Sequence, residues 1–276
     1  MQLNRLDVAQ EEESPLAFAN AVREKSILQT VGEAVRHAKA MLAFQPIVAS
    51  DPFGEVVFYE GLTRIPDETG RIIPAGQFIE KVEELETGRL IDCLALDMGL
   101  RTLARVPDLK LSINMSARSI GYGKWLDILG KALRNDSSLG KRLILEITET
   151  SAMLVPELVA TFMADLSKRG ISFALDDFGA GATSFRHLRD FRFDILKIDG
   201  EFVRGIESNP DNQVLIQALI SIAEHFGMHA VAESVETPVA AEWLRETGVD
   251  CMQGHYFARP TVNPPWQQAA VQKTKV

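Results

Sequence analysis

A chain of 276 residues, of which 46% are hydrophobic, is long enough for one large core and suits a single α/β barrel or two smaller domains. The formal net charge of −9 argues against a polymeric nucleic acid as partner, because affinity for nucleic acids comes mainly from clustered Lys and Arg. A small phosphorylated ligand remains open if metal ions supply the positive charge.

Residues 1–25 are acidic and weakly patterned, and we expect them to form a weakly structured N-terminal extension. No repeat, low-complexity segment or linker follows residue 40, which indicates a single folded domain over 26–276. The chain opens without a signal-peptide pattern, no apolar run is long enough for a membrane span, and Cys93 and Cys251 lie in patterns typical of buried residues. A cytoplasmic protein with reduced thiols is therefore expected.

Helical and β-like segments alternate along the domain. Helix-like spacing covers 24–39, 77–86, 89–105, 124–134, 156–169, 211–226 and 238–247, and β-like runs cover 41–48, 56–62, 109–115, 143–148, 172–177, 195–199, 229–232 and 251–257. Strands that alternate with crossover helices indicate a mainly parallel sheet, and eight of them predict an α/β fold closed into a (β/α)8 TIM-type barrel. Only a short turn with Pro52 and Gly54 separates the first two runs, so we expect a hairpin, one antiparallel strand near the N-terminus and an irregular barrel.

The fifth β-like run ends on two adjacent carboxylates, Asp176 and Asp177, in the sequence SFALDDFGAG. Parallel α/β folds build their active sites at this edge of the sheet, and neighbouring acids repel each other unless a proton, a cation or hydrogen bonds relieve them. A divalent metal ion would provide that relief. For this pair alone, the alternative that Asp177 caps the next turn and Asp176 is solvated is equally favoured.

Polar residues also end the other runs, and together they predict a barrel mouth lined with carboxylates. They are Glu60, Asn114, Glu146 with Glu149, Lys197 with Asp199, Glu233 with Glu236, and Gln253. Such oxygen ligands suit Mg²⁺ or Mn²⁺, and the lack of Cys or clustered His near these positions argues against zinc. Two ions roughly 3.5–4 Å apart would bind phosphodiester oxygens and generate hydroxide near neutral pH, so the expected chemistry is phosphodiester hydrolysis.

Structural roles remain open for single members of this set. Glu149, Asp199 and Glu236 fit helix caps or surface acids. Lys197 fits either a group that holds a nucleophilic water or one half of a buried ion pair. Glu233 fits a metal ligand, a group that orients water, or a capping acid. His255 could line the mouth beside Gln253.

Eight ordered motifs carry a family resemblance. They are AFQPIV at 43–48, YEGLTR at 59–64, SINMS at 112–116, LEITET at 145–150, LDDFGAG at 175–181, LKIDG at 196–200, AESVET at 232–237 and QGHYFARP at 253–260. With these motifs, the chain over 26–262 resembles the EAL domain family, the cyclic di-GMP phosphodiesterases that hydrolyse this bacterial second messenger to linear pGpG.

The resemblance implies a role for each matching residue. Two Mg²⁺ or Mn²⁺ ions would be bound by Glu60, Asn114, Glu146, Asp176, Asp177 and Glu233. Catalysis would involve Lys197, which matches the lysine at the nucleophilic water, together with Glu60 and Glu233. Substrate binding would involve Gln45, Leu62, Arg64, Gln253 and His255. Glu149, Gly179 and Ser184 match an element that couples the site to dimerisation, so a homodimer is expected. Any input signal would come through the N-terminal segment, a regulatory protein partner or oligomerisation.

Five departures from the family pattern bear on activity, and one of them is His255, which stands where tyrosine is common. Gly61 replaces the signature alanine and is expected to loosen the backbone beside Glu60 without loss of that ligand. Ala180 and Ala182 replace a hydroxyl and an aromatic residue in the loop, and Ser234 replaces a glycine. We favour an active, metal-dependent phosphodiesterase, and the alternative is a catalytically weak or inactive cyclic di-GMP receptor or interaction module.

Overall fold

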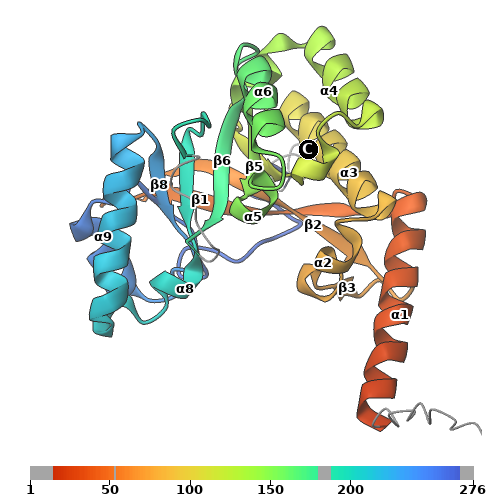
Figure 1. Ribbon diagram of the computed structural model, residues 1–276, viewed down its shortest axis with the longest axis horizontal. Helices are drawn as coiled ribbons and strands as arrows, with labels where there is room; N and C mark the ends of the chain where they lie inside the picture. The colour runs from red at the N-terminus through yellow and green to blue at the C-terminus, as the bar shows by residue number, and fades with distance from the viewer. Residues whose placement is uncertain (1–14, 53, 180–187, 268–276) are drawn as a thin grey trace, which may run out of the picture.

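A computed structural model describes residues 15–52, 54–179 and 188–267 of the chain, and their side chains from residue 22 onward. Within this part, eight strands close into a ring in the order β1-β9-β8-β7-β6-β5-β4-β2, where β2 pairs back with β1 (Figure 1). A ninth strand, β3, pairs with β2 outside the ring. The strands are β1 (Met41–Ala49), β2 (Val56–Pro66), β3 (Ile72–Ile73), β4 (Leu111–Asn114), β5 (Leu143–Thr148), β6 (Ser172–Phe178), β7 (Ile195–Ile198), β8 (His229–Ala232) and β9 (Cys251–Met252).

The predicted irregular barrel is confirmed. Strand β1 runs antiparallel to both of its neighbours, β2 and β9, whereas every other pair in the ring is parallel. The reversal follows from the short connection between β1 and β2, which leaves no room for a crossover helix.

Helices cover the outside of the ring. They are α1 (Pro15–Arg36), α2 (Ile79–Val82), α3 (Glu86–Arg105), α4 (Gly123–Asn135), α5 (Glu149–Ala152), α6 (Pro156–Ser167), α8 (Gly200–Val203), α9 (Pro210–His225) and α10 (Pro238–Thr247). Proline occupies the first turn of α6, α9 and α10, where its missing N–H costs nothing. No helix among the described residues is long and apolar enough to cross a membrane.

Several elements differ from their predicted bounds, and three of these differences affect how the chain is organised. Helix α1 starts at Pro15, inside the extension that the sequence predicts to be weakly structured, and the division at residue 25 stays a prediction. Strand β9 ends at Met252, because the chain then turns toward the loop after β8, where Gln253 accepts a hydrogen bond from the Val235 N–H. The segment 77–86 is not one continuous helix: the short helix α2 is separated from α3, since Leu85 adopts an extended conformation.

The barrel interior has two layers. An apolar layer of buried side chains consists of Ile47, Phe58, Ile144, Ala174, Ile195, Val231 and Cys251. Because side chains on a strand alternate between faces, the residue two positions along the same strand or just beyond its end points inward at the next level. Those residues are Gln45, Glu60, Glu146, Asp176, Lys197, Glu233 and Gln253. The alternation thus places one polar layer directly on the apolar one.

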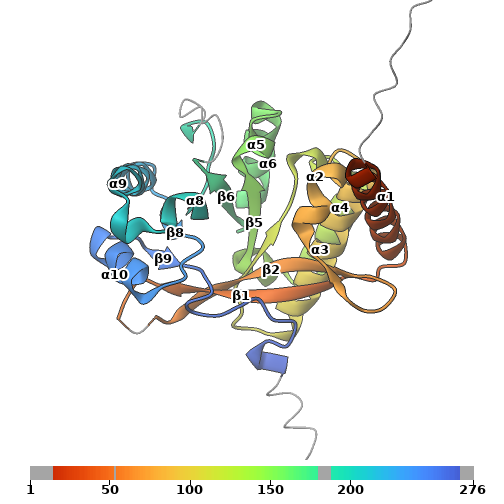
Figure 2. The same ribbon diagram turned by 90° about the horizontal axis from the view of Figure 1, so that it is seen from below.

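Outside the ring, a large apolar core fills the space between the sheet and its helices. Among the described residues no crossover helix joins β1 to β2, and Trp266 covers this hairpin, with ring centroids 5.1 Å from Phe44 and 4.8 Å from Tyr59. A second, smaller core joins α1 to β2, β3, α2 and α3 through Val31, Val35 and their neighbours. Helix α1 and helix α9 lie at opposite ends of the molecule, as the two views in Figure 1 and Figure 2 show.

Candidate active site

The two acids at the end of β6 both reach the barrel mouth because the strand is irregular there. Regular alternation would send Asp176 and Asp177 to opposite faces. The pairing of β6 with β7 shifts register between Leu175 and Phe178, and Asp177 has a left-handed backbone with φ of 54°. Aspartate tolerates this conformation better than most residues. A local bulge thus brings both carboxylates to the mouth.

Lys197 on β7 lies at the centre of the polar layer. Its side chain is 1% exposed, and its Nζ lies 2.6 Å from Glu233 Oε1, 2.7 Å from Glu146 Oε2, 2.9 Å from Asp176 Oδ1 and 3.6 Å from Glu60 Oε2. One ammonium therefore contacts carboxylates from four other strand ends. The ion pair that the sequence left open for Lys197 is present, and it lies in the site.

Glu60 connects the lysine cluster to two amides. Asn114 Nδ2 donates to Glu60 Oε1 at 2.8 Å, and Gln253 Nε2 donates to Glu60 Oε2 at 2.7 Å. Gln253 Nε2 also lies 3.2 Å from Gln45 Oε1. These hydrogen bonds fix the orientation of the Glu60 carboxylate between β1, β4 and β9.

The site contains more negative charge than Lys197 can neutralise. Burial raises the pKa of Glu146 well above its ordinary value, and the charge of Glu60 adds to this. Burial, followed by the nearby Asp176, raises the pKa of Glu233 to about 8. Burial and the adjacent Asp176 also raise the pKa of Asp177 to about 6. An additional cation would relieve all three groups.

For Glu60 and Lys197, unlike the three acids above, the surroundings favour the charged form. Burial disfavours the charged form of Glu60, but the Lys197 charge and the hydrogen bonds from Gln253 and Asn114 outweigh it and lower the pKa of Glu60. Burial likewise disfavours the Lys197 ammonium, but the surrounding carboxylates, Asp176 first, raise its pKa well above the ordinary value. Both groups are therefore held in their charged forms.

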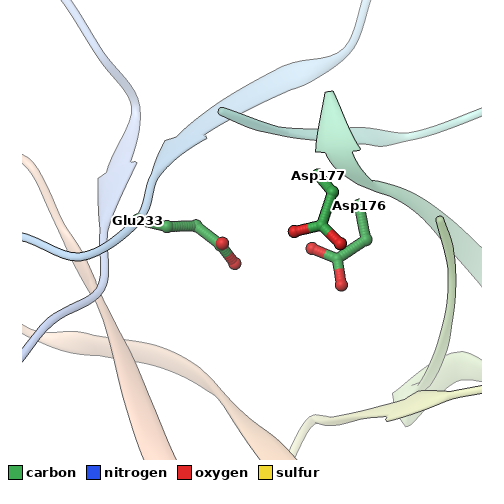
Figure 3. A group of neighbouring side chains, drawn as sticks. All are labelled: Asp176, Asp177 and Glu233. Atoms are coloured by element: carbon green, nitrogen blue, oxygen red, sulfur yellow. The ribbon is translucent and has the colours of Figure 1, made fainter. Parts of the chain in front are cut away.

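The donor set fits a hard divalent cation. Asp176, Asp177 and Glu233 each offer a carboxylate oxygen within 4.8 Å of the others, and their side chains converge across the mouth (Figure 3). Glu146 Oε1 and Gln253 Oε1 are buried oxygens without a hydrogen-bond partner among the described residues. Buried polar atoms normally have partners, so oxygens of this kind point to an absent ligand. Carboxylate and amide oxygens suit Mg²⁺ or Mn²⁺.

Two cavities open beside the polar layer, and Leu62 lines both. The smaller cavity, of about 250 Å³, is lined by Gln45, Gln253 and His255 among others. The larger one, of about 580 Å³, is lined by Arg64, Asn114 and Asp177, whereas Glu60, Asp176, Lys197 and Glu233 line the smaller one. A volume of this size suits a small-molecule ligand.

Most of the sequence-predicted residues that the structure describes therefore meet at one mouth, and Glu149 lies apart from them. Glu149 is buried in α5, outside the Lys197 cluster, where its Oε2 accepts a hydrogen bond from Gly179 N at 3.1 Å. Ser184 falls outside the described residues. His255 is exposed at the rim of the smaller cavity.

The larger cavity also contains carboxylates that the sequence analysis does not single out. Asp92 on α3 accepts hydrogen bonds from Ser116 N at 3.0 Å and Ser119 Oγ at 2.5 Å, and Ser116 Oγ donates to Glu83 at 2.9 Å. Burial raises the pKa of Asp92 to about 7. The sequence feature that could have identified Asp92 is its position four residues before the buried Leu96, which places an acid on the apolar side of a helix.

Residues 28–260 match the family described as EAL domain. The Pseudomonas aeruginosa protein MucR, described as a bifunctional diguanylate cyclase/cyclic di-GMP phosphodiesterase, is 28% identical over 249 residues, which are 88% of this chain and 36% of that protein. The solved structure of the PaMucR phosphodiesterase in complex with c-di-GMP is 27% identical with a TM-score of 0.75, and the match covers 88% of this chain and 99% of that one. Klebsiella pneumoniae BlrP1, in a manganese/cy-diGMP complex, is 26% identical with a TM-score of 0.69, and the match covers 80% of this chain and 56% of that one. The chain spans about a third of the length of the curated relatives it matches.

Proposed function

The chain belongs to the EAL domain family, and from this premise we propose that it hydrolyses cyclic di-GMP to linear pGpG in a reaction that depends on two Mg²⁺ or Mn²⁺ ions. The observation that carries the proposal is the convergence of four carboxylates on the buried Lys197 at the barrel mouth, with Asp177 beside them. Relatives described as cyclic di-GMP phosphodiesterases, and the c-di-GMP and manganese complexes of similar structures, support the choice of substrate and metal.

The metal ligands would be the four carboxylates of the polar layer together with Asn114 and Asp177, which lie beside it. They are Glu60, Asn114, Glu146, Asp176, Asp177 and Glu233. When bound, the ions would polarise the phosphodiester and favour ionisation of the attacking water. Two of the donors are held by strand ends that the barrel fixes in register, since Asn114 pairs with Glu146 across β4 and β5. The protein thus presents these donors without having to reorganise them.

Lys197 would act as a positioning and charge-balancing group. Its ammonium holds the carboxylates of Glu146, Asp176 and Glu233 within 2.9 Å, and its buried position prevents it from moving toward bulk water. In this arrangement the carboxylates stay aimed at the mouth, where an attacking water would be oriented by Lys197 and Glu233.

The two cavities would hold the substrate. Arg64 is half-buried, and its guanidinium would contact a phosphate, since Arg forms paired hydrogen bonds to phosphate oxygens. Leu62 would pack against the nucleotide between the cavities, and Gln45, Gln253 and His255 would contact it from the smaller one.

Turnover of cyclic di-GMP by the purified protein tests the proposal. The assay separates products by chromatography with Mg²⁺, with Mn²⁺ and with EDTA. We expect pGpG only when metal is present. Glu60→Ala and Asp176→Ala should abolish turnover and retain the folded far-UV spectrum, whereas Glu242→Ala, which removes an exposed acid on α10, should leave turnover unchanged. Wild-type turnover by either site variant would refute the metal assignment.

A second outcome separates the enzyme from the alternative. Retention of intact cyclic di-GMP by the metal-loaded protein, with no pGpG, would identify a receptor. Absence of both binding and turnover would reject the substrate itself.

We further propose a homodimer that uses the start of α6. Leu154, Val155 and Leu158 are 47%, 40% and 47% exposed there, on a surface next to α5. Glu149 on α5 reaches the end of β6 through Gly179, so this surface is connected to the strand that carries the acid pair. Leu154→Glu should convert the dimer to a monomer in light-scattering chromatography, and an unchanged mass would reject this surface. A coupling role for Ser184 and a regulatory protein partner stay predictions.

A further inference from the structure

Ile113 on β4 fills the space beside two glycines. A Cβ placed on Gly61 would lie 2.7 Å from Ile113 Cδ1, 3.3 Å from Ser112 O and 3.4 Å from Leu42 Cδ1. A Cβ placed on Gly99 of α3 would lie 2.8 Å from Ile113 Cδ1 and 2.9 Å from its Cγ1. The δ-methyl of Ile113, a residue only 1% exposed, is therefore enclosed between a strand glycine and a helix glycine.

This packing lies directly behind the site. Gly61 and Ile113 are opposite each other in the parallel pair β2–β4, and both face the outer core. Their neighbours Glu60 and Asn114 face the mouth and share the 2.8 Å hydrogen bond. Glu60 is bonded to Gly61 and Asn114 to Ile113, and adjacent residues of a strand point to opposite faces. A change in the distance between the strands on the outer face, at Gly61 and Ile113, therefore also moves Glu60 relative to Asn114 in the mouth.

We propose that Ile113 is a positioning residue for the Glu60–Asn114 pair, and that glycine is favoured at position 61 because the Ile113 Cδ1 atom occupies the volume that an alanine methyl would need. From the sequence, glycine at this position is expected to loosen the backbone beside Glu60. The contacts instead indicate that no free space remains beside Gly61, because the Ile113 side chain fills the volume between Gly61 and Gly99. The inference deepens the proposed function, since its metal-binding test rests on the proposed ligands, but its packing test does not.

A double-mutant cycle tests the fit. Gly61→Ala forces its new methyl against Ile113, and overpacking of this kind should lower Tm by about 3–10 °C in EDTA. Ile113→Val removes the Cδ1 atom and should lower Tm by about 2–4 °C on its own. In the double variant the alanine methyl replaces the lost δ-methyl, so its Tm should lie above that of Gly61→Ala.

The helix side offers a matched control. Alanine normally stabilises a helix interior relative to glycine. Gly32 of α1 has no atom within 4 Å of a built Cβ, so Gly32→Ala should keep or raise Tm. Gly99→Ala makes the same change in α3 against Ile113 and should lower Tm, with recovery when Ile113→Val is added.

A metal titration shows whether the packing positions the ligands. Mn²⁺ binding without nucleotide, measured by calorimetry, should weaken about tenfold in Gly61→Ala and recover in the double variant. A purely structural role would lower Tm without changing Mn²⁺ affinity. Wild-type Tm for Gly61→Ala, or no rescue by Ile113→Val, would overturn the proposal. If the wild type failed to hydrolyse cyclic di-GMP, only the proposed function would fall, because neither Tm nor Mn²⁺ affinity depends on turnover.

Discussion

Replacement of Lys197 by methionine removes the only ammonium that the described part of the chain places among the carboxylates of the polar layer, while it keeps most of the side-chain volume. The Nζ atom lies within 2.9 Å of three carboxylates and 3.6 Å from a fourth, and the side chain is 1% exposed. Loss of one partner of a buried ion pair typically costs about 3–5 kcal/mol, because it leaves an unbalanced buried charge. For a domain of this size, that loss corresponds to a Tm about 6–20 °C lower.

Thermal unfolding in EDTA measures this effect, with Lys168→Met as the matched control. Lys168 Nζ lies 3.0 Å from Asp165 Oδ1, a similar distance, but the two side chains are 75% and 65% exposed. A surface pair of this kind contributes about 0–1 kcal/mol, so the control should shift Tm by no more than about 4 °C. Equal shifts for the two variants would refute the reasoning that burial makes Lys197 essential.

The same samples with Mn²⁺ added give a second test. A cation that binds only the folded protein raises Tm, and the rise grows with affinity. In Lys197→Met the added ion is the main positive charge among the carboxylates, so its Tm should rise more than that of the wild type. A smaller rise would mean that the carboxylates do not act as one cation site.

Three further predictions concern residues around the site. In the folded state Asp92 keeps its proton up to a pKa of about 7, so the Asp92 contribution to wild-type stability should fall as pH rises from about 4 to 7. Asp92→Asn does not titrate, so its Tm in EDTA should rise relative to that of the wild type between pH 5 and pH 8. Parallel curves of Tm against pH for the two proteins would contradict this. Ser234 has a left-handed backbone with φ of 55°, so Ser234→Gly should raise the free energy of unfolding by about 0.5–1 kcal/mol in urea titrations. A lower free energy of unfolding would show that the packing of the Ser234 side chain on Gly200 stabilises the fold by more than the backbone strain costs. Trp266→Ala should cost about 2–3 kcal/mol through exposure of Phe44 and Tyr59, and a cost below about 0.5 kcal/mol would reject Trp266 as a cover of the hairpin.

The sequence predicts the polar layer well because the rule that places it is local. In a parallel barrel the strand ends meet at one edge, so Glu146 at the end of β5 and Lys197 at the end of β7 can be assigned to the mouth from their position alone. The short turn before β2 likewise predicts the reversed strand β1.

Contacts between distant segments could not be predicted in the same way. The hydrogen bond from Gln253 to Glu60 joins residues 193 positions apart, and no local pattern specifies it. The bulge that turns Asp177 into the mouth depends on the register between β6 and β7. Asp92 was missed because its role depends on the Ser119 hydroxyl in η2 (Ala117–Ser119) and on the backbone N–H of the neighbouring Ser116, which only the fold brings to α3.

The apolar layer below the carboxylates acts as a plug for the barrel. Ile47, Ala174 and Val231 are completely buried in it, so it offers no path for water or ions from the opposite end. Whatever reaches the carboxylates must enter and leave through the mouth. A ligand that fills the mouth therefore also closes the exit for anything bound beneath it. We therefore expect exchange at this site to be sequential, so that the deepest component is the first to enter and the last to leave.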